Sequence, residues 1–193
     1  AMDAAIAPSG NDYTDPLALR AIEMVFDWLP RAYKNGNDRE ARFKMIMAAN
    51  IAGIAFGMSG CHLTHSFGHS LGSVYEMHHG LCVGFFIPQS FQFCAKVTDK
   101  HLAICKSLDI PAPTAQEGLN NLLANVREFL TSLNVPLALK DFGISKADFE
   151  GKLPKLVEYA YGDISCYLSP RPITAAQCEK VMRYAYEGQD IDF

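Results

Sequence analysis

Apolar residues recur at helical spacing along almost the whole chain. Residues 14–36 place Leu17, Ile22, Val25, Phe26 and Leu29 on one broad face, as an amphipathic helix does. Similar patterns cover residues 37–60, 114–136, 145–163 and 174–188, and no segment alternates convincingly like a paired β-strand. Residues 80–87 could form a short strand, but no partner strand is evident. The pattern therefore predicts an all-α bundle of about seven to nine helices in one domain, residues 1–193.

Polar residues that commonly cap helices precede several of these segments. The expected N-terminal caps are Thr14, then Asn37 or Asp38, then Thr114, which forms a capping-box pattern with Glu117. Pro30 should kink or end the first long helix. The run from Met45 to Met58 is almost free of charge, so the helix that contains it is expected to be buried at the centre of the domain.

The overall composition excludes several classes of protein. The formal net charge is −4 and no basic run occurs, so we expect no nucleic-acid partner. No apolar run reaches the roughly eighteen residues of a membrane span, and the first ten residues do not resemble a secretion signal. The six cysteines form no Cys-x-x-Cys pair and lie mostly in apolar stretches, which indicates reduced core residues of a cytoplasmic protein.

Five of the six histidines lie within residues 62–80, a glycine-containing stretch with one acidic residue. His65 and His69 are four apart, so on a helix they project from the same face. His78 and His79 follow after one further segment and end at Gly80, which suits a turn. Because imidazole is a common ligand of zinc, iron, copper and nickel, this density favours a metal or catalytic site over simple packing.

Spacing alone leaves the ligand set open. A local zinc site of His65, His69 and either His78 or His79 would leave a fourth position for water or substrate. A carboxylate could come from several residues, and the sequence singles out none of them. These are Asp3, Asp12, Asp15 and Glu76.

Four segments resemble the helical C-terminal domain of iron-containing (group III) alcohol dehydrogenases. They are "TDPLALRAIEMVFDWLPRAY", "REARFKMIMAANIAGIAF", "HSFGHSLGSVYEMHHG" and "SPRPIT", and they occur in the family's order. The family pattern of His-x3-His followed by His-Gly is matched by His65, His69 and His79. Two positions depart from the pattern: His78 stands where the family often has proline, and Ser169 where asparagine is common.

The resemblance implies a role for each matched residue. His65 and His79 would be ligands of Fe²⁺ or Zn²⁺, and His69 an active-site histidine that handles a proton or positions substrate. Phe56 would line the substrate pocket, while Gly60, Gly68 and Gly72 would allow tight helix packing. The implied reaction is hydride transfer between an alcohol and NAD(P), which gives an aldehyde or ketone. His78 is expected to be a solvent-facing turn residue.

The resemblance also implies that part of the active site lies outside this chain. The family's remaining ligands, an Asp and a His four residues later, would fall before residue 1. Asp3 is too close to Asp15 to be that Asp, and Ala7 stands where the His is required. The family's N-terminal α/β domain, which holds the cofactor, is expected to be missing too. We therefore expect the chain alone to be inactive and its uncovered apolar surface to favour homo-oligomers.

Two other functions are compatible with the same residues. A catalytically silent helical domain that acts only in subunit association would explain the missing ligand pair. A glycerol dehydrogenase-like branch shares the helical architecture, but the histidine spacing matches the alcohol dehydrogenases better. The sequence does not determine the alcohol, the native metal or the choice between NAD and NADP. It also does not determine whether the enzyme is split over two chains or truncated.

Overall fold

The computed structural model describes residues 1–193 and is entirely helical, with no strand. Eleven α-helices occur, nine of them at least seven residues long, with one short 3₁₀ helix, so the all-α prediction is confirmed. Residues 80–87, which could have formed a strand, are helical except for the single turn residue Phe86. The helices are α1 (Met2–Ile6), α2 (Thr14–Lys34), α3 (Arg39–Ser59), α4 (Leu63–Tyr75), α5 (His79–Phe85), α6 (Ile87–Cys94), α7 (His101–Ser107), α8 (Ala115–Ser132), η1 (Leu139–Phe142), α9 (Lys146–Gly162), α10 (Ile164–Tyr167) and α11 (Ala175–Glu187).

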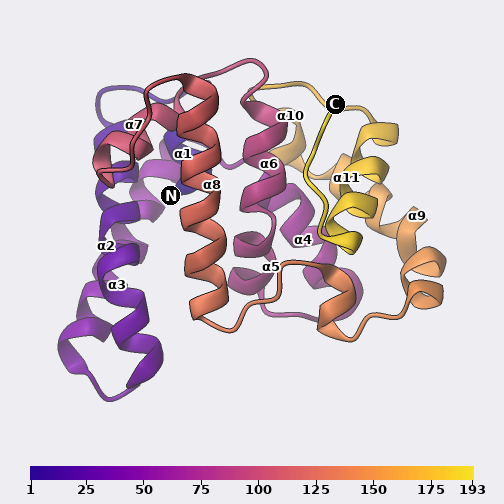
Figure 1. Ribbon diagram of the computed structural model, residues 1–193, viewed down its shortest axis with the longest axis horizontal. Helices are drawn as coiled ribbons and strands as arrows, with labels where there is room; N and C mark the ends of the chain where they lie inside the picture. Colours follow the sequence, from indigo (N-terminus) through magenta and orange to yellow (C-terminus); the bar gives the residue numbers. More distant parts are fainter.

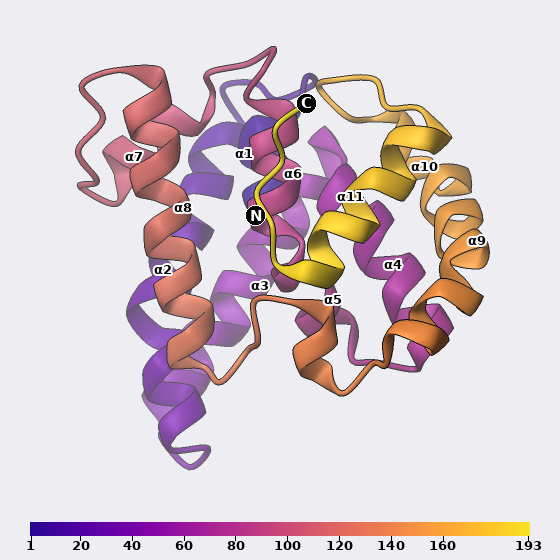
Figure 2. The same cartoon turned by 45° about the vertical axis from the view of Figure 1, so that its right-hand side comes forward.

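The helices form three groups side by side (Figure 1). In Figure 1 the α2–α3 hairpin stands at one side and α9 and α11 at the other, and in Figure 2 α9, α10 and α11 still lie on the side away from α2. Helices α4, α5, α6 and α8 lie between the two groups. Helix α4 contacts α5, α9 and α10, and the short α1 contacts both α2 and α4. The centre of the molecule is therefore where segments far apart in sequence meet.

Several helix boundaries follow the predicted capping chemistry. The Asp38 side chain accepts a hydrogen bond from the Ala41 amide at the start of α3, and Thr114 accepts one from the Glu117 amide at the start of α8. Thr14 does not cap α2, because it is already the first helical residue and its own amide donates to Asn11 Oδ1. Pro30 lies inside α2 and does not end it, since the helix continues to Lys34.

The prediction that the helix containing Met45–Met58 is buried was wrong. Helix α3 packs on α2 through Ala41, Ala48 and Ala55, which repeat every seven residues and are fully buried. These small side chains let the two helices approach closely, and the large apolar side chains are left on the other faces. Six of these are exposed: Phe43, Ile46, Met47, Ile54, Phe56 and Met58.

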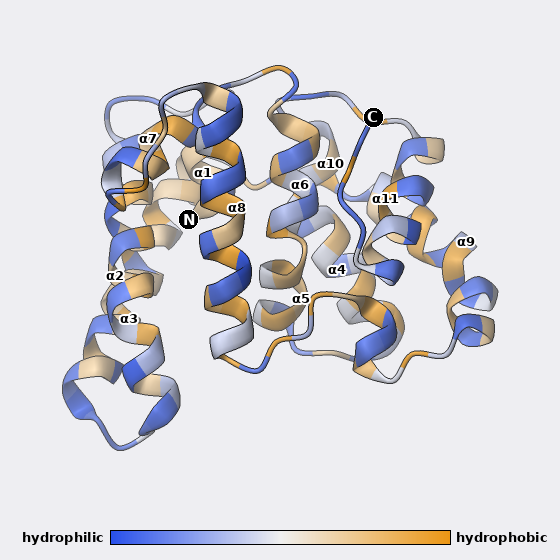
Figure 3. Cartoon of the chain, viewed as in Figure 1, coloured by the Kyte–Doolittle hydropathy of each residue, from blue (hydrophilic) through white to orange (hydrophobic).

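The remaining apolar side chains form one continuous core. Its largest fully buried members are phenylalanines, most of them from α4 to α6, including Phe67, Phe86 and Phe91, with Phe149 from α9. In Figure 3 helix α8 carries both hydrophilic and hydrophobic residues, while α5, to its right and below α6, is mostly hydrophobic. All six cysteines are free thiols and all but the half-buried Cys61 are buried, as predicted. None of the helices by itself has the length and hydrophobicity of a membrane span. Helices α3 and α4 taken together would have them, but the two are bent by 111° relative to each other.

Candidate metal and substrate site

Each face of α4 meets a different neighbour, and this fixes where its histidines project. Ser66 and Ser70 donate hydrogen bonds of 2.6 Å to the carbonyl oxygens of Ala160 and Leu156 on α9. Gly68 lies so close to α5 that a Cβ atom there would stand 2.6 Å from Cγ2 of Val83. With these two faces occupied, His65 and His69 lie on a remaining face and are only partly buried.

Three imidazole rings come together at the junction of α4 and α5. The ring centroids of His65 and His69 are 5.6 Å apart, those of His65 and His79 5.7 Å, and those of His69 and His79 5.2 Å. His79 is the first residue of α5, so the sharp turn after α4 returns it to the two α4 rings. The exposed His78 occupies the N-cap position of α5 without a side-chain capping bond, and it joins none of these ring pairs. Spacing had left His78 and His79 as equal choices, and the fold selects His79 for the cluster.

A buried carboxylate orients His65. Oδ2 of Asp3 lies 2.9 Å from Nδ1 of His65 and accepts a hydrogen bond of 2.8 Å from the His62 amide. Burial alone would raise the pKa of Asp3, but the adjacent imidazole of His62 and the hydrogen bond to His65 hold it well below its usual range. An ionised carboxylate can only accept, so Nδ1 of His65 carries a proton, and Nε2 on the other side of the ring can bind a metal only after losing its own proton. Asp3 was rejected above as a metal ligand, and here it is the hydrogen-bond partner of a histidine.

His62 lies on the other side of the same carboxylate. Its ring is fully buried, with Nδ1 3.2 Å from Oδ1 of Asp3, but the geometry forms no hydrogen bond. Both ring nitrogens of His62 and Oδ1 of Asp3 therefore lack a hydrogen-bond partner. Burial lowers the pKa of His62 and outweighs the attraction of Asp3. We treat His62 as a neutral neighbour of the site, since nothing exposes it to solvent or to the cavity.

The pKa values of His65 and His79 are shifted in opposite directions. Burial alone would lower the pKa of His65, but hydrogen bonds to Asp3 and Cys61 and the charge of Asp3 raise it to about 9. Burial, followed by the neighbouring His69 and His65, lowers the pKa of His79. His79 is therefore a neutral imidazole near pH 7, the form that binds metals.

A second carboxylate holds His69. Oδ2 of Asp163 lies 2.7 Å from its Nδ1, and Oδ1 of Asp163 accepts from the Ser165 amide at the start of α10. Burial would raise the pKa of Asp163, but the hydrogen bonds from His69 and Ser165 lower it. The sequence analysis missed this residue. Its only signal was a possible helix cap in "YGDIS", which does not distinguish a cap from a histidine partner.

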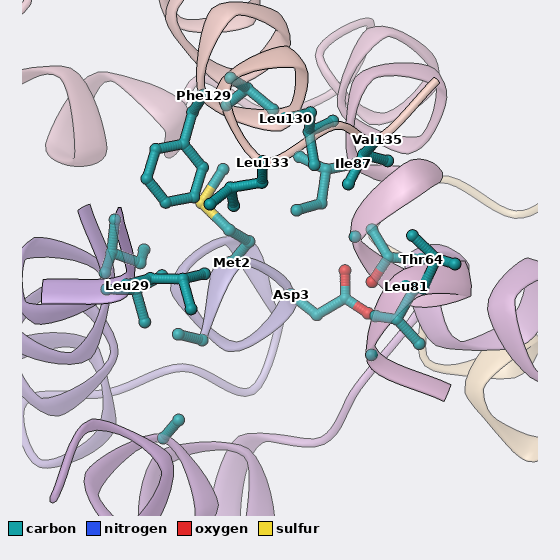
Figure 4. Close-up of a pocket in the computed structure, with 18 of the residues that line it drawn as sticks. Met2, Asp3, Leu29, Thr64, Leu81, Ile87, Phe129, Leu130, Leu133 and Val135 are labelled. Carbon is teal, nitrogen blue, oxygen red and sulfur yellow. The ribbon is translucent and has the colours of Figure 1, made fainter. Parts of the chain in front are cut away.

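The site opens onto an apolar cavity of about 870 Å³. His65, His78, His79, Thr64 and Asp3 lie on its lining, together with Phe56 from α3. The ring of Phe56 is half-exposed and its centroid lies 6.2 Å from that of His65. Figure 4 shows the Asp3 carboxylate on the same side of this cavity as Thr64 and Leu81. His69 is part of the ring cluster but does not line the cavity.

The donor set partly fits a divalent cation. Two imidazoles on one tetrahedral ion, with metal–nitrogen bonds of about 2.0–2.1 Å, place their ring centroids roughly 5 Å apart. All three ring spacings are near this value, and both His65 and His69 contact a carboxylate through Nδ1, as metal-bound histidines usually do through their other nitrogen. As the side chains stand, no three His, Cys, Asp or Glu donors surround a common point. The donors in this arrangement therefore do not form a complete ligand set for such an ion.

The helical fold and the clustered histidines agree with what is found among known proteins. Residues 1–186 match the model of the C-terminal domain of the Fe-containing alcohol dehydrogenase family. The chain belongs to this family.

Individual relatives give the same result. The chain is 30% identical to the NADPH-dependent butanol dehydrogenase of Clostridium saccharobutylicum, over all of this chain and 50% of that protein. It is 27% identical to the NAD-dependent methanol dehydrogenase of Bacillus methanolicus, over 96% of this chain and 48% of that protein. The chain therefore spans about half the length of the curated relatives it matches.

Solved structures share the fold. An iron-containing alcohol dehydrogenase from Thermococcus thioreducens superposes with a TM-score of 0.84 at 26% identity, over 97% of this chain and 48% of that one. A 1,3-propanediol oxidoreductase superposes with a TM-score of 0.85 over 95% of this chain and 49% of that one. At 23% identity, the second likeness concerns the fold alone.

Proposed function

We propose that this chain forms the metal- and alcohol-binding wall of an NAD(P)-dependent alcohol dehydrogenase that interconverts alcohols with aldehydes or ketones. The observation that carries the proposal is the cluster of His65, His69 and His79 beside an apolar cavity, in a chain of this family. The nucleotide would be bound by the part of the relatives that this chain does not match. The free cysteines are consistent with a reducing, cytoplasmic setting.

In this proposal His65 and His79 hold the metal ion, Fe²⁺ or Zn²⁺. When bound, such an ion acts as a Lewis acid that stabilises the negative charge on the alcohol oxygen. Asp3 orients His65 through Nδ1, so that Nε2 faces the shared site. His79 needs no such partner to be deprotonated, because its lowered pKa keeps it neutral.

His69 would handle the proton that the alcohol loses. Asp163 accepts from Nδ1 of His69, which leaves Nε2 with a lone pair able to accept a proton. The carboxylate also stabilises the imidazolium that this transfer creates. Phe56 would form an apolar wall against the carbon part of the substrate, since its ring borders the cavity next to His65.

Because only two of the proposed ligands are in place, we propose that the chain alone binds metal weakly and does not turn over. A purified chain supplied with NADH or NADPH, Fe²⁺ or Zn²⁺ and short aldehydes should give no cofactor oxidation above the protein-free rate. Clear turnover would contradict this part of the proposal.

Calorimetric titration tests the assignment of the metal ligands and does not require the chain to be enzymatically active. Zn²⁺, or Fe²⁺ under anaerobic reducing conditions, should bind the wild-type chain, and His65→Ala or His79→Ala should weaken binding by at least about tenfold. His78→Ala is the matched control, because His78 is the exposed neighbour of His79 and should leave affinity unchanged. Dependence on His69 and His78 instead would refute the assigned roles.

A catalytically silent helical domain is the second candidate function. The observation in its favour is that no three donor side chains surround a common point. Absence of any metal binding in the same titration would support this alternative, in which the exposed apolar side chains of α3 serve only in subunit association.

A further inference from the structure

Two of the buried cysteines contact each other. The thiols of Cys166 and Cys178 are hydrogen-bonded, although Cys166 belongs to the single-turn helix α10 and Cys178 to α11. Both side chains lie in the core, with Cys166 4% exposed and Cys178 fully buried. Neither thiol is part of the histidine cluster, so the pair is a separate feature of the fold.

The two thiols differ in reactivity. The hydrogen bond from Cys178 lowers the pKa of Cys166 and outweighs the opposing effect of burial. The same hydrogen bond, together with burial, raises the pKa of Cys178. Because the thiolate is the nucleophile, Cys166 reacts first with an oxidant, and Cys178 is placed to react with the product.

An oxidant reaches Cys166 only when α10 opens. This helix has four residues, of which only Ser165 and Cys166 are buried, while Ile164 and Tyr167 are 73% and 68% exposed. A single turn that buries so little surface opens locally at a small cost in free energy. Hydrogen peroxide is small enough to reach the sulfur through such an opening.

Helix α10 also begins at the carboxylate that holds His69. Oδ2 of Asp163 lies 2.7 Å from Nδ1 of His69, and the backbone carbonyl of Asp163 accepts a hydrogen bond of 3.0 Å from the Cys166 amide. Asp163 and Cys166 therefore belong to the same turn. A disulfide requires an S–S distance of about 2.05 Å, which is much shorter than any hydrogen bond between thiols. Movement of Cys166 toward α11 therefore moves Asp163 with it.

We propose that Cys166 and Cys178 form a peroxide-sensitive dithiol whose oxidation ties α10 to α11 and draws Asp163 away from His69. The Cys166 thiolate attacks one oxygen of hydrogen peroxide and becomes a sulfenic acid, while the O–O bond breaks and the released hydroxide takes a proton to become water. The Cys178 sulfur then attacks the sulfenic sulfur, which forms the S–S bond and releases a second water. The two thiols lose two electrons and two protons, and one peroxide is reduced to two waters.

The consequence for catalysis rests on the proposed function, because there His69 handles the proton of the alcohol. The disulfide itself does not, since it depends only on the contact between α10 and α11.

Peptide mapping of the wild-type chain tests the disulfide. The chain is treated with hydrogen peroxide, its free thiols are alkylated in denaturant, and it is digested without reductant. Mass spectrometry should then find the peptides of Cys166 and Cys178 joined and two hydrogens lighter than the reduced pair. Cys105 is the internal control, because it is also buried but its thiol donates to the Gly118 carbonyl at 3.3 Å. Absence of the joined peptide, or equal oxidation of Cys105, would overturn the proposal.

Spectra of the histidine rings test the link to His69. They are recorded on the Cys61→Ala variant, which lacks the thiol hydrogen-bonded to His65. In long-range ¹H–¹⁵N correlation spectra, peroxide should shift His69 toward the Nε2-protonated form, because Nδ1 loses its carboxylate partner. The ring of His101 is the control, since its Nε2 donates to a backbone carbonyl in the α7–α8 region. A joined peptide without any change at His69 would overturn the link between the dithiol and the site.

Cys178→Ala in the same background removes the second thiol. Peroxide should then leave the His69 spectrum unchanged, whereas Cys105→Ala should respond as the parent does. A shift of His69 that persists in Cys178→Ala would overturn the proposal. None of these measurements needs metal, cofactor or turnover. A failed metal titration with an intact disulfide response would therefore refute the proposed function and leave the dithiol standing, and the converse would refute the dithiol alone.

Discussion

Nδ1 of His69 lies 2.7 Å from Oδ2 of Asp163, a residue 94 positions later in the chain. The contact joins α4 to the start of α10, where Oδ1 of the same carboxylate accepts the Ser165 amide. The carboxylate is thus fixed by the backbone and in turn fixes the imidazole ring.

This relationship predicts the tautomer of His69. In the neutral ring, Nδ1 should carry the proton and Nε2 the lone pair, because an ionised carboxylate can only accept a hydrogen bond. Long-range ¹H–¹⁵N correlation spectra of the chain report the protonation of each ring nitrogen. Asp163→Ala should shift His69 toward the Nε2-protonated form, while Asp12→Ala, at an exposed aspartate, should change nothing. An Nε2-protonated His69 in the wild-type chain would contradict the role given to Asp163.

The contact between Asp3 and His65 predicts how stability depends on pH. The pKa of His65 is raised to about 9 from an ordinary value of about 6.5, so its stabilising effect is complete below pH 6.5 and is lost as pH rises through 9. Asp3, with its pKa lowered, contributes above its ordinary pKa of about 4 and loses this only at strongly acidic pH. The free energy of unfolding should therefore fall by on the order of 2 to 3 kcal/mol between pH 6.5 and 9.5 because of His65.

Urea denaturation with a chelator present measures this fall. His65→Gln should remove the corresponding part of the slope, because glutamine does not titrate. Parallel pH profiles for the wild type and His65→Gln would show that the contact with Asp3 contributes nothing to stability.

Gly68 is predicted to be the glycine least tolerant of substitution on α4. A Cβ atom there would lie 2.6 Å from Cγ2 and 2.8 Å from Cα of Val83, so α5 would have to shift. Gly68→Ala should destabilise the chain by about 1 to 3 kcal/mol. Gly151→Ala is the matched control inside α9, where a Cβ meets nothing within 4 Å. Thermal unfolding should show this control unchanged or stabilised by up to about 1 kcal/mol, and an equally mild Gly68→Ala would contradict the tight α4–α5 contact.

The exposed apolar face of α3 predicts self-association. Phe43 and Ile46 are 60% and 64% exposed, and they lie one turn apart. Burying such side chains between copies of the chain removes them from water, so association should grow with concentration. Sedimentation velocity at micromolar concentrations should show this for the wild type and for Arg42→Glu, an exposed polar position on the same helix. Phe43→Glu with Ile46→Glu should give monomers; a wild type that is monomeric throughout would contradict the prediction.

The sequence predicted the local features of this molecule well. Asp38 and Thr114 cap their helices because capping depends only on a side chain and the amide three residues later. The pairing of His65 with His69 followed from helical geometry alone. The burial of α3 was predicted wrongly because hydrophobicity does not indicate which face packs. The small Ala48 and Ala55 form the seam with α2, while larger side chains remain outside.

The parts of the site that the sequence did not predict depend on contacts between distant segments. Asp163 reaches His69 because α10 begins beside α4, and nothing near residue 163 indicates this. Asp3 was judged only by its spacing from Asp15 and by the missing histidine at position 7. The fold brings it to His65 through α1, whose contact with α4 has no signature in either helix.

The location of a bound ion tests the central claim most directly. Crystals of the chain grown with Zn²⁺ and measured at the zinc absorption edge would locate the ion by its anomalous signal. The peak is expected at the α4–α5 junction, about 2.0–2.1 Å from Nε2 of His65 and from a ring nitrogen of His79. A peak bound by His69 and His78 without His65, or no peak beside these rings at saturating zinc, would contradict it.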